Sequence, residues 1–122
     1  MKILVSDPIT DTGISILEDS GFHIIYLPDS DSKELNKAIQ DADGMIIRSG
    51  TKVDLKMIES SKKLQVIGRA GVGVDNIDLL SAKEHGVMVV NAPRASTQSV
   101  IELTIGHLLT SIRHITSSNR GL

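Results

Sequence analysis

Cysteine is absent from this 122-residue chain, and its only aromatic residues are Phe22 and Tyr26. The first absence rules out a disulfide framework and thiolate chemistry, and the scarcity of aromatic rings argues against binding single-stranded nucleic acid by base stacking. No apolar run approaches the ~18 residues needed to cross a bilayer, and the beginning of the chain does not resemble a secretion signal. The net charge of −2, with both signs interspersed, gives no general attraction to nucleic acid or membranes. We therefore expect a cytoplasmic protein without nucleic-acid or membrane partners, in which any anion-binding site is local.

Short runs rich in Val, Ile and Leu alternate with stretches of helical spacing before Pro93. These patterns predict strands over residues 3–6, 23–27, 45–47, 65–67 and 87–90, and helices over 13–20, 32–42, 55–60 and 79–85. Capping residues agree with them: we expect helices to begin at Ser32, Asp54 and Asp78, and to end before Gly21 and Gly86. The alternation predicts an α/β fold, a flavodoxin-like doubly wound five-stranded parallel sheet with right-handed crossovers.

The pattern changes after Pro93, where Ser96 or Thr97 can cap a long helix. Its apolar residues fall at alternating steps of four and three and form one stripe, made of Ile101, Ile105, Leu108, Ile112 and Ile115. We expect this stripe to pack either against the preceding sheet or against another subunit. The abrupt polar ending also leads us to expect that the chain stops partway through a larger protein.

Two arginines follow neighbouring strands, at the edge where the carboxyl ends of parallel strands meet. Arg48 follows the third strand in Arg48-Ser49-Gly50, and Arg69 opens the turn Arg69-Ala70-Gly71-Val72-Gly73 after the fourth. Ligands of open parallel sheets bind outside these carboxyl ends. Glycines let the backbone approach a ligand closely, and guanidinium groups bind carboxylate or phosphate. We predict a site for a small anionic molecule; the alternative is that the arginines only form ion pairs with Asp7, Asp43 or Asp75.

The Gly71-Val72-Gly73 turn resembles part of a dinucleotide-binding fingerprint but does not complete it. Position 76 is Asn where a third glycine would stand, and the turn follows the fourth strand rather than the first. We therefore do not expect this turn to bind a pyrophosphate. We expect structural or surface roles, and no metal site, for His23, His85, His107 and His114. No catalytic residue is assigned, because the rim carries no obvious general base.

Four stretches of the chain carry a resemblance to a known family. They read D-G-M-I-I-R-S-G-T-K-V at 43–53, L-Q-V-I-G-R-A-G-V-G-V-D-N-I-D at 64–78, G-V-M-V-V-N-A-P at 86–93 and S-V-I-E-L-T-I-G at 99–106. In content and order they resemble the D-2-hydroxyacid dehydrogenases, most closely the D-3-phosphoglycerate dehydrogenases. The resemblance implies that residues 1–95 are the N-terminal part of an incomplete substrate-binding domain. It also implies that residues 96–122 are the first helix of a truncated NAD-binding Rossmann domain, with a homodimer formed through helix 97–116.

The same resemblance implies a function, the NAD-dependent oxidation of 3-phosphoglycerate to 3-phosphohydroxypyruvate in serine biosynthesis. The residues it implies for substrate binding are Arg48, Ser49, Arg69, Val72, Gly73 and Ser96. The amides of Val72 and Gly73 would hold the carboxylate, and the arginines with Ser49 would surround the phosphate. Thr104 would face the nicotinamide of NAD. The family's catalytic arginine, acid and histidine, and most of its NAD site, are expected beyond this chain, so the chain alone should be inactive.

Three other functions stay open. The chain can belong to another D-2-hydroxyacid dehydrogenase, because Ser96 replaces an asparagine that touches substrate in many relatives and reaches less far. It can also be a stand-alone small-anion-binding module. A phosphoacceptor signalling domain has this length and topology, but it needs an aspartate after strand three and a lysine after strand five, where this sequence has Arg48 and Asn91.

Overall fold

The computed structural model describes residues 1–113 of the chain. Within this range the strands form a single parallel sheet in the order β2-β1-β3-β4-β5. Their bounds are β1 Lys2–Val5, β2 His23–Tyr26, β3 Gly44–Ile47, β4 Val66–Arg69 and β5 Met88–Asn91. This sheet confirms the predicted α/β doubly wound fold, and each predicted strand lies within one or two residues of an observed one.

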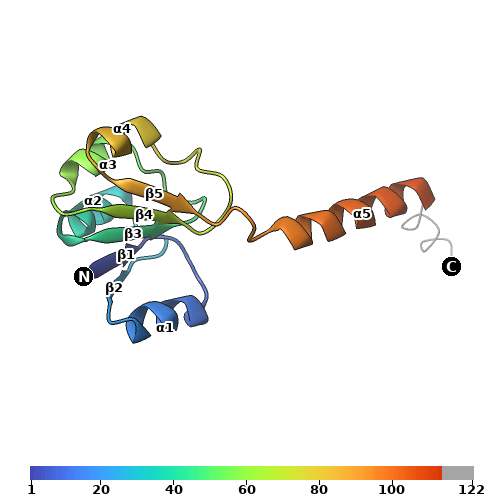
Figure 1. Ribbon diagram of the computed structural model, residues 1–122, viewed down its shortest axis with the longest axis horizontal. Coiled ribbons are helices and arrows are strands. Elements are labelled where there is room, and N and C mark those ends of the chain that lie inside the picture. The colour runs from blue at the N-terminus through green and yellow to red at the C-terminus, as the bar shows by residue number, and fades with distance from the viewer. Residues whose placement is uncertain (114–122) are drawn as a thin grey trace.

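Helices cover the sheet from both sides (Figure 1). They are α1 Asp11–Asp19, α2 Ser32–Ala38, the short 3-10 helix η1 Ile39–Asp41, α3 Leu55–Ser60, α4 Leu79–Glu84 and α5 Thr97–Arg113. Figure 1 shows α1 on one face and α2, α3 and α4 on the other. Because the strand order changes direction after β2, connections of one hand must place these helices on opposite faces. The change of direction makes the gap between β1 and β3 the switch point of the sheet.

Aspartate side chains begin three of the helices. Asp54 and Asp78 cap α3 and α4 as predicted, each accepting a backbone N–H three residues on at 3.0 Å. The bond from the Ser81 N–H lowers the pKa of Asp78 below its usual value. The prediction for α2 was wrong by one residue, since its cap is Asp31, whose carboxylate accepts the Glu34 N–H at 2.8 Å. Both residues can cap, and the aspartate one position earlier supplies the charged acceptor.

The helix ends agree with the sequence at two glycines and differ at one helix. Gly21 and Gly86 follow α1 and α4 with φ of 82° and 70°, a left-handed conformation that favours glycine. The helix predicted over 32–42 is shorter, because α2 ends at Ala38 and continues only as the 3-10 turn of η1.

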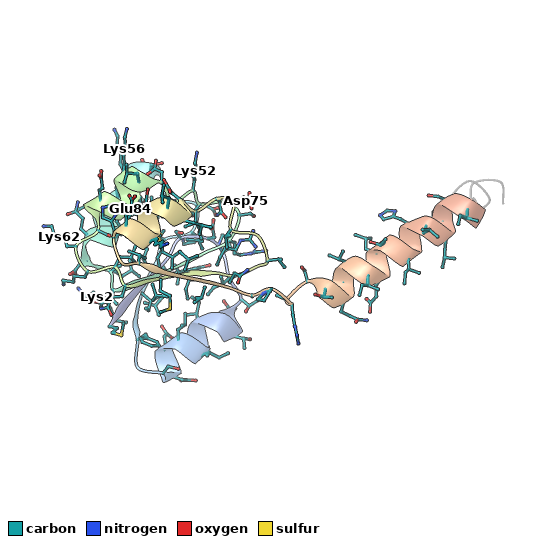
Figure 2. All side chains as sticks on the ribbon, turned by 45° about the horizontal axis from the view of Figure 1, so that its top comes forward. Lys2, Lys52, Lys56, Lys62, Asp75 and Glu84 are labelled. Carbon is teal, nitrogen blue, oxygen red and sulfur yellow. The ribbon has the colours of Figure 1, made fainter. Side chains whose placement is uncertain are left out.

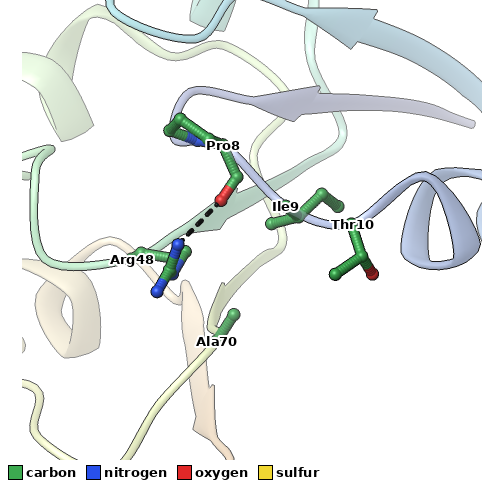
Figure 3. Close-up of a pocket in the computed structure, with 5 residues that line it drawn as sticks. All are labelled: Pro8, Ile9, Thr10, Arg48 and Ala70. Atoms are coloured by element: carbon green, nitrogen blue, oxygen red, sulfur yellow. Dashed lines mark hydrogen bonds between the residues drawn. The ribbon is translucent and has the colours of Figure 1, made fainter.

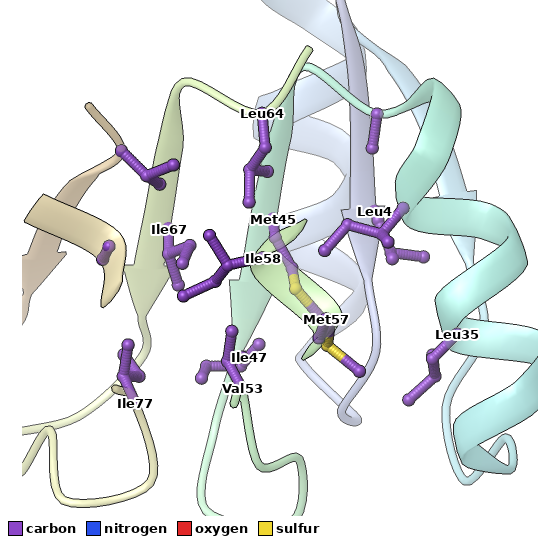
Figure 4. Packing of buried hydrophobic residues seen from close by; sticks show 14 residues of the cluster. Leu4, Leu35, Met45, Ile47, Val53, Met57, Ile58, Leu64, Ile67 and Ile77 are labelled. Atoms are coloured by element: carbon purple, nitrogen blue, oxygen red, sulfur yellow. The ribbon is translucent and has the colours of Figure 1, made fainter. Parts of the chain in front are cut away.

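The main core lies between the sheet and the layer of α2, α3 and α4 (Figure 4). From the sheet it takes Leu4, Met45, Ile47 and Ile67, and from the helices Leu35, Met57, Ile58 and Ala82, among others. The opposite face is covered less completely: α1 has no fully buried residue, and β5 leaves Met88 and Val90 64% and 46% exposed on that side.

Helix α5 projects away from the sheet beyond the end of β5 (Figure 1). Its predicted stripe residues Ile101, Ile105, Leu108 and Ile112 are all exposed, whereas Ile115 lies outside the described residues. Figure 2 shows the side chains of α5 pointing outward with no other element beside them. Packing of the stripe on this chain's own sheet is therefore not observed. None of the helices in residues 1–113 has the length and apolar character to cross a membrane.

Candidate functional site

A cavity of about 440 Å³ opens at the switch point of the sheet. We call it the rim cavity; it is lined by Pro8, Ile9 and Thr10 after β1, Arg48 after β3 and Ala70 after β4. Figure 3 shows these five side chains around it, with Arg48 facing the segment that follows β1. The size is in the range of small-ligand sites, and the location is the one where doubly wound sheets bind ligands.

The Arg48 side chain lines this cavity, and hydrogen bonds from its backbone and from its guanidinium hold it in place. Its N–H donates to Asp7 Oδ2 at 2.6 Å, and its Nη1 donates to the Pro8 carbonyl oxygen at 3.1 Å. The residue is exposed, and four of the five N–H donors of its guanidinium are not needed for the bond to Pro8. The guanidinium is thus oriented but still able to bind an anion.

The glycine turn after β4 is held by its neighbours on both sides. The Ala70 N–H donates to the Ile47 carbonyl at 2.8 Å, and the Gly71 carbonyl accepts the Ala92 N–H at 2.9 Å. Asn91 Nδ2 donates to the Val72 carbonyl at 2.7 Å. The amides of Val72 and the glycine after it donate to no acceptor within residues 1–113. These two exposed N–H groups are therefore available to an anion.

Arg69 folds back over its own turn. A Cβ added to Gly71 would collide with the Arg69 guanidinium, so a larger residue there would require this side chain to move. Arg69 Nε is buried and has no hydrogen-bond partner in the described part of the chain. The residue lines a second cavity of about 250 Å³, together with Ala70, Asn91 and Ala92. The two arginines thus follow paired strands as predicted, but they line adjoining cavities that share Ala70 rather than one cavity.

Neither arginine forms an ion pair within residues 1–113, where the ion pairs present join Asp41 to Lys2 and, at 2.7 Å, to Lys63. The alternative in which Arg48 and Arg69 serve only as ion-pair partners is not what the structure shows. The hydrogen bonds from Lys2 and Lys63 lower the pKa of Asp41 to about 2. This network is exposed and lies at the opposite end of the strands from the rim cavity.

Of the predicted site residues only Arg48 lines the rim cavity, so Val72 and Gly73 lie outside it, as do the three that remain. Ser49 is exposed beside Arg48. Ser96 directly precedes α5, and Thr104 lies on α5, where its hydroxyl donates to the Val100 carbonyl at 2.7 Å. The structure does not bring Ser96 or Thr104 to the cavity, and their contacts with substrate and nicotinamide stay predictions.

Sequence reasoning missed one wall of the cavity, formed by Pro8, Ile9 and Thr10. The hydroxyl of Thr10 also accepts the Gly13 N–H at 3.2 Å and so begins α1. The switch-point rule could have identified this wall, because the segment follows β1 at the place where the strand order reverses.

No histidine of residues 1–113 lines the rim cavity. His85 lies at the end of α4, where its Nδ1 is 2.8 Å from the Ser81 carbonyl oxygen. His23 and His107 are exposed on β2 and α5, and His114 lies outside the described residues. From the described part of the chain the cavity therefore receives donors for an anion but no imidazole for proton transfer.

Comparison with known proteins assigns the chain to a family. Residues 3–119 match the family model of the D-isomer specific 2-hydroxyacid dehydrogenase, catalytic domain. The chain belongs to this family. Among its relatives, D-3-phosphoglycerate dehydrogenase of Methanocaldococcus jannaschii is 49% identical over 122 residues, which are 100% of this chain and 23% of that protein. The enzyme of the same name from Sus scrofa is 42% identical over 114 residues, 93% of this chain and 21% of that protein.

A solved structure of the dehydrogenase family supports the same assignment. The crystal structure of NAD+-bound 3-phosphoglycerate dehydrogenase from Entamoeba histolytica superposes with a TM-score of 0.80 at 32% identity, covering 90% of this chain and 38% of that one. The chain spans only 21–23% of the length of the two curated relatives.

Proposed function

We propose that this chain supplies the substrate-binding part of an NAD-dependent D-3-phosphoglycerate dehydrogenase, which oxidises 3-phosphoglycerate to 3-phosphohydroxypyruvate in cytoplasmic serine biosynthesis. The observation that carries the proposal is the pair of unbonded amides at Val72 and Gly73, beside two arginines without ion-pair partners in residues 1–113. These groups present neutral and charged donors at one edge of the sheet. A substrate with a carboxylate at one end and a phosphate at the other matches them.

Each residue has a defined role in the proposal. The amides of Val72 and Gly73 bind the substrate carboxylate, and Arg48 with Ser49 binds the phosphate. Arg69 adds a second positive charge, and its unpaired Nε gains an acceptor if the side chain rotates toward the anion. Binding and orienting the substrate is the contribution of residues 1–95.

The described residues do not form a dinucleotide site by themselves. The turn after β1 contains Pro8, which has no N–H, and no glycine before Gly13. The turn after β4 contains two of the fingerprint's glycines, but it follows the fourth strand rather than the first. Asn76 stands where the fingerprint has its third glycine. In the proposal NAD, the hydride acceptor, is bound mainly by a further Rossmann domain that begins near residue 96, with Thr104 beside the nicotinamide.

Titration of the 122-residue chain with 3-phosphoglycerate, followed by NMR, tests the proposal. We expect saturable shifts at the amides of Val72 and Gly73 and at the side chains of Arg48 and Arg69. Arg48→Gln should weaken binding about tenfold, because a charge-assisted hydrogen bond is lost. Arg94→Gln, which removes an exposed arginine outside both cavities, is the matched control and should leave binding unchanged.

Two results distinguish the alternatives. Equal binding of D-lactate, which has no phosphate, would favour another D-2-hydroxyacid dehydrogenase over the proposed one. No saturable binding of either compound would remove the proposal. NADH production by the chain alone with 3-phosphoglycerate would contradict the expectation that the chain binds without catalysing, and would favour neither alternative.

We also propose that α5 pairs with a second copy of this chain. The support is its set of exposed apolar residues, Val100, Ile101, Leu103, Ile105, Leu108, Leu109 and Ile112. A patch of this kind marks an interaction surface. Sedimentation should give a dimer for the wild type and a monomer for Leu108→Lys, while His107→Lys on the same helix stays dimeric. A wild type that sediments as a monomer with a folded helix would contradict the pairing.

A further inference from the structure

The side chains of Asp7 and Asn76 hydrogen-bond the backbone N–H and carbonyl groups of the two residues at the ends of one turn. We call residues 48–51 the arginine turn. Asp7 Oδ2 accepts the N–H of Arg48 at 2.6 Å and the N–H of Thr51 at 3.2 Å. From the other side, Asn76 Nδ2 donates to the carbonyl oxygens of Arg48 at 2.7 Å and Thr51 at 2.6 Å. A carboxylate can only accept and the amide nitrogen only donates, so each side chain suits the two groups it meets.

Most of the arginine turn is exposed to solvent, since only Thr51 of its four residues is buried. On one side lies the rim cavity, lined by Arg48. On the other side lies a cavity of about 400 Å³ lined by Asp7, Gly50 and Thr51, among others. Hydrogen bonds therefore hold the exposed part of the turn, while Thr51 is also held by its burial and by the 2.8 Å contact of its Oγ1 with Ser6 Oγ. Asp7 itself is firmly placed, since only 6% of its surface is exposed.

Gly50 shows how closely the carboxylate meets the turn. A Cβ at this position would collide with Asp7 Oδ1. A side chain here would therefore require the Asp7 carboxylate or the turn to shift.

Asn76 connects this turn to the glycine turn. It lies three residues after Gly73, and its own carbonyl accepts the Val53 N–H at 2.8 Å, just beyond the arginine turn. The Asp78 N–H in turn donates to the Val53 carbonyl at 2.9 Å. The segment that carries the free amides and the segment that carries Arg48 are thus joined at several points.

We propose that Asp7 and Asn76 are positioning residues that set the spacing between the Arg48 guanidinium and the amides of Val72 and Gly73. The inference rests on the proposed function, because it assumes that one ligand spans both groups. A ligand that uses both ends of the site then depends on the spacing, whereas a ligand that uses only the arginine does not. Neither residue needs to touch the ligand.

Two ligands separate this role from a general structural one. The 122-residue chain is titrated with 3-phosphoglycerate, which has two anionic ends, and with inorganic phosphate, which has one. Asn76→Ala should weaken 3-phosphoglycerate binding about tenfold or more, since two hydrogen bonds are lost, while phosphate affinity changes less than about threefold. Asp7→Asn keeps an oxygen acceptor and should retain the wild-type ratio of the two affinities. Asn36→Ala on α2 is the control for loss of an asparagine elsewhere and should change neither.

Hydrogen exchange provides a second measurement that needs no ligand. In Asn76→Ala, the amides of Arg48 and Thr51 should exchange about tenfold faster or more, with the amide of the core residue Ile67 unchanged. Unchanged exchange at both amides, or an equal loss of affinity for both ligands, would overturn the inference. If the wild-type chain binds neither ligand, the proposed function fails, and the exchange rates still decide whether Asn76 holds the turn.

Discussion

Replacing Thr51 with valine measures what a buried pair of hydroxyl groups contributes to the fold. Thr51 Oγ1 lies 2.8 Å from Ser6 Oγ. The two residues expose only 7% and 2% of their surfaces. Neither hydroxyl has another hydrogen-bond partner within residues 1–113. Valine keeps the shape of threonine but not the hydroxyl, so the variant leaves Ser6 buried and unpaired.

The magnitude follows from this burial. An unpaired buried hydroxyl costs about 1–3 kcal/mol, so Thr51→Val should lower the free energy of unfolding by about that amount, and Ser6→Ala should do the same. The double variant should cost less than the sum by about 1 kcal/mol or more, because it leaves no hydroxyl unpaired. For a chain of this length, each 1 kcal/mol corresponds to a Tm change of about 4 °C.

Urea unfolding followed by far-ultraviolet circular dichroism provides the values. The midpoint should fall while the m-value stays constant, since the surface exposed on unfolding hardly changes. Thr12→Val on the exposed surface of α1 is the matched control and should stay within about 0.5 kcal/mol of the wild type. The reasoning would be refuted if the effects of the two single variants summed to that of the double variant within about 0.5 kcal/mol. The two hydroxyls would then not depend on each other.

Three further predictions concern the sheet and its surface. Ile67→Ala, at a fully buried position, should cost about 2–5 kcal/mol in urea unfolding, whereas Val90→Ala on the open side should cost under about 1 kcal/mol; equal costs would mean that the two faces are equally packed. Gly44→Ala places a Cβ 2.8 Å from a neighbouring isoleucine methyl group and should lower the Tm, whereas Gly68→Ala meets its nearest atom at 3.7 Å and should not. The lysine partners of Asp41 lower its pKa to about 2, so its ion pairs stabilise the fold above the ordinary pKa of 3.8 and cease to do so as the pH falls toward 2. NMR titration of the Asp41 carboxyl carbon should give a midpoint near 2, and a midpoint near 3.8 would contradict the prediction.

The sheet could be predicted because its strands are short apolar runs that become buried. Met45, Ile47 and Ile67 lie in uninterrupted apolar runs, and the structure buries all three. Helix starts were predicted where one aspartate stood alone before the helix, as at Asp54. At α2 two adjacent residues could cap, and sequence spacing does not decide between them.

The candidate site could be predicted only as far as the strand ends. Arg48 and Arg69 follow β3 and β4 as expected, but the direction of the Arg69 side chain depends on the space left by Gly71. The bonds of Asp7 and Asn76 to the arginine turn join residues 25 to 44 positions apart in the sequence. Such contacts form only when the chain has folded, so no local sequence pattern predicts them.

Because α5 does not pack against the sheet, the equilibrium between its folded and unfolded forms is separate from the folding of the sheet. A 17-residue helix with no packed face is close to the length at which helices are only marginally stable in water. Pairing with a second copy would supply that face, and helix formation and association would then be a single linked process. The helical content of α5 would then depend on protein concentration, while the sheet, whose main core packs against α2, α3 and α4 of the same chain, would keep its content at every dilution.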